Sequence, residues 1–410
     1  METMPETNHE LPYFPFARPP LDPPPEFSKF QQEARLAPVR LWNGERAWLV
    51  TRFDDVRELL ADSRFSAIPS SPGFPNVSEG RSRLVHSETP SLIRMDDPDH
   101  ARFRRMVTRE FTINRITALR PIVEAEVEAL IDKLLAGPNP GDFHSVFSLQ
   151  LPAVVIAKML GVPLSDNDFF AEQAAKKVDN SLPPEEVVEA GRKLRAYIVD
   201  LLHEKMRGPE QYDDIVGRLI LDHMQPGHLS FEEAIPMIEL LIIAGHETTA
   251  NSLSLGLLSL LQHREAFAVL RADPNDDIVR RAVEEMLRFH SVVQLMCGRV
   301  AREDVPFAGK LIRKGEGILP MLNQADRDPG RFPNPDLFDI LRPTMTPHVA
   351  FGFGVHQCLG QPLARLEMNA AFSRIAARLP TLELAVPVSE IPFKNEFSIN
   401  HGVNALPVRW

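Results

Sequence analysis

The chain contains few cysteines and no long apolar run. Its two cysteines, Cys297 and Cys358, are too few for a disulfide framework and are typical of a protein in a reducing cytoplasm. The most apolar stretch, residues 235–261, is interrupted by Glu239, Glu247 and Asn251, and such residues are too polar for the centre of a bilayer. The sequence therefore predicts a cytoplasmic protein without a membrane span.

Other features are also missing. The first residues are polar and acidic, so no signal peptide is expected. No Gly/Ser linker or repeat divides residues 1–410, so we expect one domain preceded by a Pro-rich arm at residues 1–25. No Gly-x-Gly-x-x-Gly fingerprint of a dinucleotide site occurs. The net charge of −11 argues against nucleic acid as a partner.

The pattern of apolar residues predicts a mainly α fold with a small β region. Helices are expected at 54–61, 100–111, 117–135, 184–207, 231–262 and 277–289. Strands are expected near the two ends of the chain, at 39–42, 47–51, 305–307, 317–321 and 382–386. Two long stretches, 66–92 and 325–350, lack periodicity, and loops of this length usually carry function or wrap over a site.

Cys358 lies in a Gly-rich segment just before a predicted helix, in Phe351-Gly352-Phe353-Gly354-Val355-His356-Gln357-Cys358-Leu359-Gly360. The N–H groups of a helix N-terminus favour a thiolate over a thiol. One thiolate cannot build a tetrahedral zinc site or hold an iron–sulfur cluster, whereas haem iron accepts a single protein thiolate. The alternative is a buried cysteine in a turn, which is common.

The expected helix at 231–262 carries polar residues at its middle, Ala244-Gly245-His246-Glu247-Thr248-Thr249. Ser230 and Glu233 form the pattern of a capping box at its start. Ala and Gly would give a flat surface for a planar ligand, and the Thr248 hydroxyl would bond the carbonyl of Ala244. The alternative is a packing seam of small residues.

Three further patterns have an ordinary surface explanation. Glu285 and Arg288 are spaced to pair on one helix, which is usually a weak surface pair. His100 and Arg104 share one face of their helix. Three other arginines of that helix point roughly the opposite way and, with Arg365, would make a basic patch or only a solvated surface: Arg102, Arg105 and Arg109.

The motif Phe-Gly-x-Gly-x-His-x-Cys-x-Gly at 351–360 resembles the haem-thiolate loop of the cytochrome P-450 superfamily. The chain resembles the soluble bacterial branch of that family, which acts on macrolides, terpenoids and sterol-like compounds. The resemblance implies the triangular helical fold of haem-thiolate monooxygenases. It also implies haem b between the long central helix and the Cys-loop helix, with Cys358 as axial iron ligand.

The same resemblance implies roles for other residues. Glu247 and Thr248 would deliver protons to bound dioxygen, and Glu285, Arg288 and Arg342 would hold the segment before the Cys loop in place. Residues that would bind the haem propionates through charge-assisted hydrogen bonds are His100, Arg104, Arg299 and His356.

The implied function is hydroxylation of an apolar or amphipathic small molecule with one oxygen atom of O2. Electrons would come from a separate ferredoxin and its reductase, docked near the arginine row, and the protein would be a monomer. The alternatives are a nitric oxide reductase or peroxide-using enzyme on the same scaffold, and a haem-binding sensor without turnover. Expected pocket segments are 66–93, 169–183, 291–295 and 397–401, which contain Phe74, Val85, Val292, Val293, Leu295 and Ile399.

Overall fold

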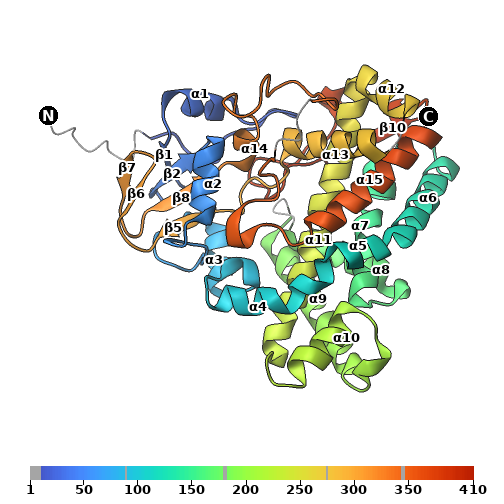
Figure 1. Ribbon diagram of the computed structural model, residues 1–410, viewed down its shortest axis with the longest axis horizontal. Coiled ribbons are helices and arrows are strands. Elements are labelled where there is room, and N and C mark those ends of the chain that lie inside the picture. The colour runs from blue at the N-terminus through green and yellow to red at the C-terminus, as the bar shows by residue number, and fades with distance from the viewer. Residues whose placement is uncertain (1–10, 88–89, 179–181, 274–275, 343–346) are drawn as a thin grey trace.

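A computed structural model describes residues 11–87, 90–178, 182–273, 276–342 and 347–410, and it is mainly α-helical (Figure 1). The α-helices are α1 Pro25–Glu33, α2 Phe53–Ala61, α3 Glu79–Ser87, α4 Asp99–Thr108, α5 Ile113–Ala118, α6 Arg120–Ala136, α7 Gln150–Leu160, α8 Asn167–Val178, α9 Pro184–Lys205, α10 Ile215–Leu219, α11 Phe231–Gln262, α12 Arg264–Ala272, α13 Asp276–His290, α14 Leu322–Ala325 and α15 Gln361–Arg378. Short 3-10 or π turns are η2 Leu92–Arg94, η3 Arg109–Phe111, η4 His144–Ser148, η5 Leu164–Asp166, η6 Pro209–Gln211, η7 Ile220–Met224, η8 Gly354–His356 and η9 Val388–Glu390.

The strands form three small sheets. They are β1 Ala37–Arg40, β2 Arg46–Val50, β3 Phe65–Ser66, β4 Gly141–Asp142, β5 Arg299–Ala301, β6 Val305–Phe307, β7 Lys310–Ile312, β8 Gly317–Pro320, β9 Glu383–Leu384 and β10 Pro407–Arg409. The largest sheet has the order β1-β2-β8-β5-β3, with β2 and β8 parallel and its other pairs antiparallel. The remaining sheets are β4-β10-β9 and β6-β7. Sheet β1-β2-β8-β5-β3 lies at the N-terminal side of the molecule, away from most helices (Figure 1).

These elements confirm the expected fold class, with two local errors. The stretch 66–92 is not a continuous loop, because it begins in β3 and contains α3. The sequence of α3 has only Leu84 and Val85 as large apolar residues, so it lacks a helical period. The single helix expected at 117–135 is two, α5 and α6, and Pro121 lies in the first turn of α6, where proline is favoured.

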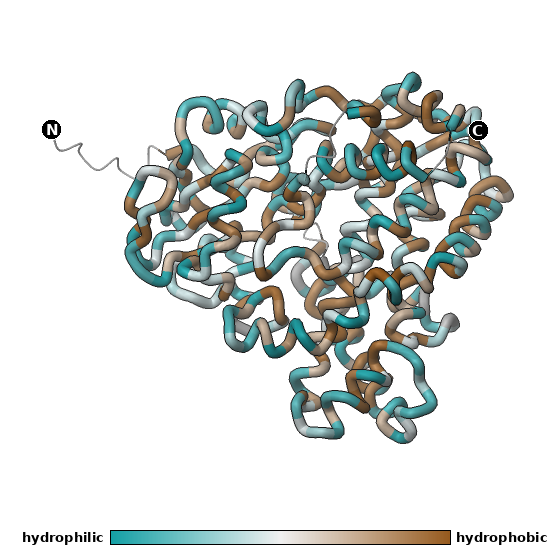
Figure 2. Tube along the Cα trace, viewed as in Figure 1, coloured by the Kyte–Doolittle hydropathy of each residue, from teal (hydrophilic) through white to brown (hydrophobic). Residues whose placement is uncertain are grey.

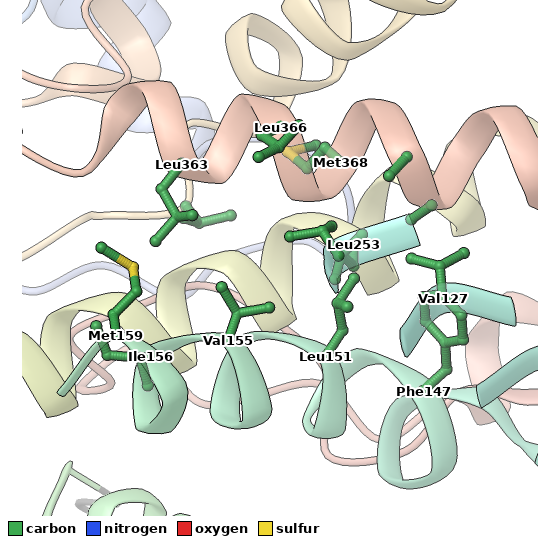
Figure 3. Close-up of a cluster of buried hydrophobic side chains, with 14 of the residues drawn as sticks. Val127, Phe147, Leu151, Val155, Ile156, Met159, Leu253, Leu363, Leu366 and Met368 are labelled. Atoms are coloured by element: carbon green, nitrogen blue, oxygen red, sulfur yellow. The ribbon is translucent and has the colours of Figure 1, made fainter. Parts of the chain in front are cut away.

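The main core lies where α6, α7, α11 and α15 meet. Leu151, Val155 and Leu253 lie between α7 and α11, while Leu363 and Leu366 face them from α15 (Figure 3). Apolar and polar residues alternate along α6, as expected for a helix with one face against a core (Figure 2). No helix in the described part of the chain is long and apolar enough to cross a membrane.

Helix α11 forms as the sequence predicts. Ser230 Oγ accepts the N–H of Glu233 at 3.1 Å, and the Glu233 carboxylate accepts the N–H of Ser230 at 2.9 Å, which completes the capping box. The helix ends at Gln262, and most of its residues are buried. It therefore crosses the body of the molecule and presents its polar middle to the interior.

The pair formed by Glu285 and Arg288 is buried, so the surface-pair alternative is wrong. The two side chains are 4% and 2% exposed and share two hydrogen bonds of 2.8 Å. Arg288 also donates to the carbonyls of Asp326 and Pro335, and Arg342 donates to both Glu285 oxygens at 3.2 Å. This network fixes the irregular segment 326–342 against α13.

Replacing Arg288 with Met leaves the buried Glu285 carboxylate with Arg342 as its remaining ion-pair partner among the described residues, at the longer distance of 3.2 Å. We expect the free energy of unfolding to fall by about 3–5 kcal/mol, the usual cost of breaking a buried ion pair. Chemical denaturation measures it. Arg342→Met is the matched control and should cost less, because the Arg342 side chain is 12% exposed and Arg288 still pairs with Glu285. Equal stability of Arg288→Met and the wild type would contradict the assignment.

Candidate active site

The Gly-rich loop around Cys358 connects the irregular segment to α15. Gly352 and Gly354 have φ values of +69° and +73°, which favour glycine. A Cβ on Gly354 would lie 2.5 Å from the carbonyl oxygen of Leu60 in α2. The N–H of Cys358 donates to the carbonyl of Phe351 at 2.9 Å, and α15 begins three residues later. The loop therefore holds Cys358 at the helix start, as the sequence predicts.

The thiol of Cys358 is accessible, yet its surroundings do not favour a free thiolate. Desolvation by the surrounding protein raises its pKa and outweighs the backbone N–H groups of Gly360 and Gln361 and the positive charge of Arg104. The N–H groups at the helix N-terminus act in the direction that the sequence predicts, since they lower the pKa of the thiol, but desolvation has the larger effect. A metal cation at the sulfur would reverse this, because a coordinating thiol loses its proton.

Four basic side chains gather beside this loop from three elements, α4, β5 and η8. The rings of His100 in α4 and His356 in η8 lie 4.1 Å apart. The guanidinium of Arg104 donates to the carbonyl of Gln357 at 2.7 Å, next to Cys358. Burial and the positive charges of Arg299, His100 and Arg104 lower the pKa of His356 to about 3. The structure thus brings together the four residues that the resemblance assigns to one anionic group.

The donors of this cluster are incompletely used by the described residues. His100 Nε2 and His356 Nδ1 are buried without a hydrogen-bond partner there. Arg299 is 6% exposed, and it donates hydrogen bonds to the carbonyls of Cys297 and Gly298, which lie close to it along the chain. Asp97, at 3.3 Å from His100, is the carboxylate paired with the cluster. Buried ring nitrogens without a hydrogen-bond partner fit an anionic ligand that carries carboxylate groups, and the neighbouring thiol fits the iron of a haem.

The middle of α11 differs in part from expectation. Thr248 Oγ1 donates to the carbonyl of Ala244 at 2.7 Å, as predicted, and Ala244 is exposed on the same face. Gly245 does not contribute to that surface, because a Cβ there would contact Ile156 of α7 at 3.5 Å. Gly245 therefore faces α7, at a distance where a methyl group would make an ordinary contact.

Glu247 is 6% exposed, and its carboxylate contacts the C-terminal segment 394–400. The sequence did not predict this contact. Glu247 Oε1 accepts a hydrogen bond from Lys394, and its Oε2 accepts one from Asn400 Nδ2 at 3.2 Å. Neither donor was recognised, since no spacing links positions 394 and 400 to position 247. Whether Glu247 relays protons stays a prediction, but its carboxylate is already paired.

The row of arginines is not a patch of free positive charge. Arg102 pairs with Glu233 at 2.5 Å, Arg109 pairs with Asp222, and Arg365 pairs with Glu284 at 2.6 Å. Arg105 is exposed, with no ion pair to any described residue. The predicted separation of the two faces of α4 is confirmed, because His100 and Arg104 turn toward the Cys loop. The predicted basic patch is wrong for three of its four members.

Two cavities lie near these elements. One of about 380 Å³ opens between η2, α4 and the start of α11, and its apolar lining includes Leu92, Met95, Phe103 and Met237. A smaller one of about 30 Å³ is lined by the expected residues Phe74 and Leu295. Parts of two expected pocket segments, residues 88–89 and 179–181, lie outside the described residues.

A long buried helix with an acid and an alcohol at its middle, a Gly-rich loop that ends in a cysteine and a cluster of basic side chains beside that loop are together the features of helical haem-thiolate proteins. Residues 183–402 match the family model described as Cytochrome P450. The chain belongs to the cytochrome P450 family, whose members are haem-iron monooxygenases.

Known relatives cover almost the whole chain. It is 42% identical over 391 residues to Cytochrome P450-SU2 of Streptomyces griseolus, covering 95% of this chain and 94% of that protein. It is 41% identical over 372 residues to the Vitamin D3 dihydroxylase of the same organism, covering 91% and 90%. The structure of the mycinamicin VIII C21 methyl hydroxylase of Micromonospora griseorubida superimposes with a TM-score of 0.90 at 33% identity, covering 98% of this chain and 100% of that one.

Two buried histidines, His144 and His246, should make the free energy of unfolding depend on pH. His246 Nε2 lies 2.9 Å from the carbonyl of Leu149, and His144 Nδ1 lies 2.8 Å from Ser254 Oγ. Burial lowers the pKa of each to about 4, from 6.5. The unfolded chain takes up these protons below pH 6.5 and the folded chain does not until about pH 4, so stability falls as the pH drops through this window.

For His246 this loss amounts to about 3 kcal/mol in total, at about 1.4 kcal/mol per pKa unit. We expect His246→Gln to flatten the decrease of the unfolding free energy between pH 6.5 and 4.5. Denaturant titrations at several pH values measure the slope. A slope equal to that of the wild type would show that His246 does not stay neutral in the folded protein.

Proposed function

We propose that this P450 binds haem b and inserts one oxygen atom of O2 into a C–H bond of an apolar or amphipathic small molecule. The observation that carries the proposal is the position of the Cys358 thiol beside the partly unpaired basic cluster of His100, Arg104, Arg299 and His356. In the proposal Cys358 is the axial iron ligand and the cluster binds the two propionates. When bound, the haem supplies oxygen activation, assisted by electron donation from the thiolate.

The residues of α11 act on protons in this proposal. The Thr248 hydroxyl donates to Ala244 on the accessible face of the helix, and rotation about its Cα–Cβ bond would turn it toward a ligand there. Glu247 is one residue further back and holds a negative charge near the same helix turn. We propose that Thr248 orients the proton that the reaction consumes and that Glu247 supplies it from solvent. This pair favours a monooxygenase over a nitric oxide reductase, a peroxide-using enzyme or a sensor.

The substrate in our proposal is apolar or amphipathic. Relatives are named for vitamin D3 and mycinamicin VIII, which differ in structure, so the names of relatives alone do not select one compound. Leu92, Met95, Phe103 and Met237 line the larger cavity and suit an apolar ligand, while the ion pair of Arg102 with Glu233 lies at the same cavity.

The electron donor in our proposal is a separate ferredoxin with its reductase, because the chain has no dinucleotide fingerprint of its own. The paired arginines leave Arg105 as the exposed, unpaired cation of the row among the described residues. Docking of the ferredoxin would then depend less on the positive charge of this row than the sequence suggests. Arg105 is the residue of the row that we expect to contact the ferredoxin. We further propose that the protein acts as a cytoplasmic monomer with one domain.

Replacement of Cys358 by His tests the iron ligand. The reduced, carbon-monoxide-bound wild type should show the red-shifted absorption of a thiolate haem, and Cys358→His should lose it while still binding haem. Cys297→Ala is the matched control and should keep the band. A wild type that is purified with haem but never shows this band would overturn the proposal.

Replacement of Thr248 by Ala tests proton delivery. Haem and substrate binding should persist, because the hydroxyl bonds only to a carbonyl of its own helix among the described residues. Reducing equivalents should be diverted from product to hydrogen peroxide, and we expect the product formed per electron pair to fall by at least about tenfold. Thr248→Ser restores a hydroxyl and should recover most of the coupling. Full coupling in Thr248→Ala would remove the hydroxyl from the mechanism.

A further inference from the structure

Glu247 forms an ion pair with Lys394 across two parts of the chain far apart in sequence. The side chains of Lys394 and Glu247 are 15% and 8% exposed. Asn400 donates to the other carboxylate oxygen. Both oxygens of Glu247 are therefore held by the C-terminal segment, and the pair is shielded enough that neither group is freely hydrated.

The segment that carries these donors is itself fixed. The N–H of Lys394 donates to the carbonyl of Gly402 at 2.9 Å, and Phe393 forms an antiparallel bridge with Val403. Gly402 packs directly on α11, because a Cβ there would lie 1.8 Å from Oδ1 of Asn251. Lys394 and Asn400 thus approach Glu247 from a tight hairpin pressed against the helix.

Two histidines close to Lys394 are neutral at neutral pH. Lys394 contributes to lowering the pKa of both His144 and His246, whose burial is the larger cause. They therefore add no positive charge near Glu247 at neutral pH. Lys394 is the cation that stabilises the Glu247 carboxylate, since among the described residues no other ion pair of Glu247 is present.

We propose that Lys394 is the positioning residue of Glu247: with Asn400 it keeps the carboxylate ionised and turned to one side, ready to take up protons from solvent. This rests on the proposed function, in which Glu247 supplies protons to Thr248. Without Lys394 the hydrogen bond from Asn400 is the remaining contact of the carboxylate among the described residues, and burial penalises a charge that has lost its counter-ion. Glu247 would then lose both its charge and its fixed direction.

The first test needs no turnover. In the resting, haem-loaded protein we expect Lys394→Met to show an infrared band of a protonated carboxyl group at neutral pH. The band should be absent from the wild type, from Lys394→Arg and from the double variant Lys394→Met/Glu247→Gln. Lys394→Gln is the fallback if the Met variant does not fold. No band in either variant would overturn the proposal that Lys394 keeps Glu247 ionised.

The second test separates positioning from mere stability. Lys394→Met should slow oxygen consumption by at least about tenfold, which is less than the roughly 10²–10⁴-fold of a proton-transfer group lost outright. It should also raise the solvent deuterium isotope effect, and we expect the same of Glu247→Gln. Lys394→Arg should restore both. The double variant should be no slower than Glu247→Gln alone, because the two residues act through one carboxylate.

Lys205→Met is the matched control, since Lys205 is also a buried lysine paired with a carboxylate, Asp214, and lies away from the middle of α11. It should lower the melting temperature without changing the isotope effect. If Lys394→Met behaves like this control, Lys394 only stabilises the fold and the proposal is wrong. If Glu247→Gln itself leaves oxygen consumption unchanged, the proton role of Glu247 fails, while the infrared result still reports on the ion pair.

Discussion

The position of the loop that carries Cys358 depends on the hydrogen bonds of one buried group, the guanidinium of Arg288. It joins Glu285 to the backbone carbonyls of Asp326 and Pro335. The Asp326 carboxylate in turn accepts the N–H of Val349 at 2.7 Å, and the N–H of Gly352 donates to the carbonyl of Val349. From there the chain enters the Cys358 loop. An irregular segment that lacks helix or sheet hydrogen bonds is thus fixed by charged side chains, because each buried polar group must find a partner.

Charge is distributed unequally between the surface and the interior. On the outer face of α4 and η3 two of the arginines meet carboxylates, since Arg102 pairs with Glu233 and Arg109 pairs with Asp222. On the inner face His100 and Arg104 gather with Arg299 and His356, and Asp97 is the carboxylate that joins them. His100 Nε2 and His356 Nδ1 are buried there without a partner among the described residues, and a buried polar group of this kind usually has one. These unpaired atoms are the observation on which the proposed haem site depends.

The middle of α11 makes three different contacts on three sides. Thr248 and Ala244 lie on the accessible side, whereas Gly245 packs against α7 and Glu247 turns toward the C-terminal hairpin. Consecutive residues of a helix point about 100° apart. One short sequence therefore serves a ligand surface, a helix contact and an ion pair at once. The hairpin that carries Lys394 and Asn400 adds to the site from the far end of the chain.

The sequence by itself determined the local features: the bounds of α11 and its capping box, the Gly-rich turn before α15, the two faces of α4, and the mainly helical class. These follow from hydrogen bonds and side-chain periods within a few residues, which a sequence displays directly. Only the tertiary structure decided that the Glu285–Arg288 pair is buried, that the arginine row is neutralised by Glu233 and Asp222, and that Lys394 reaches Glu247. Each of these joins residues brought together by packing, and the environment of a charge, which sets its partners and its pKa, exists only after the chain has folded.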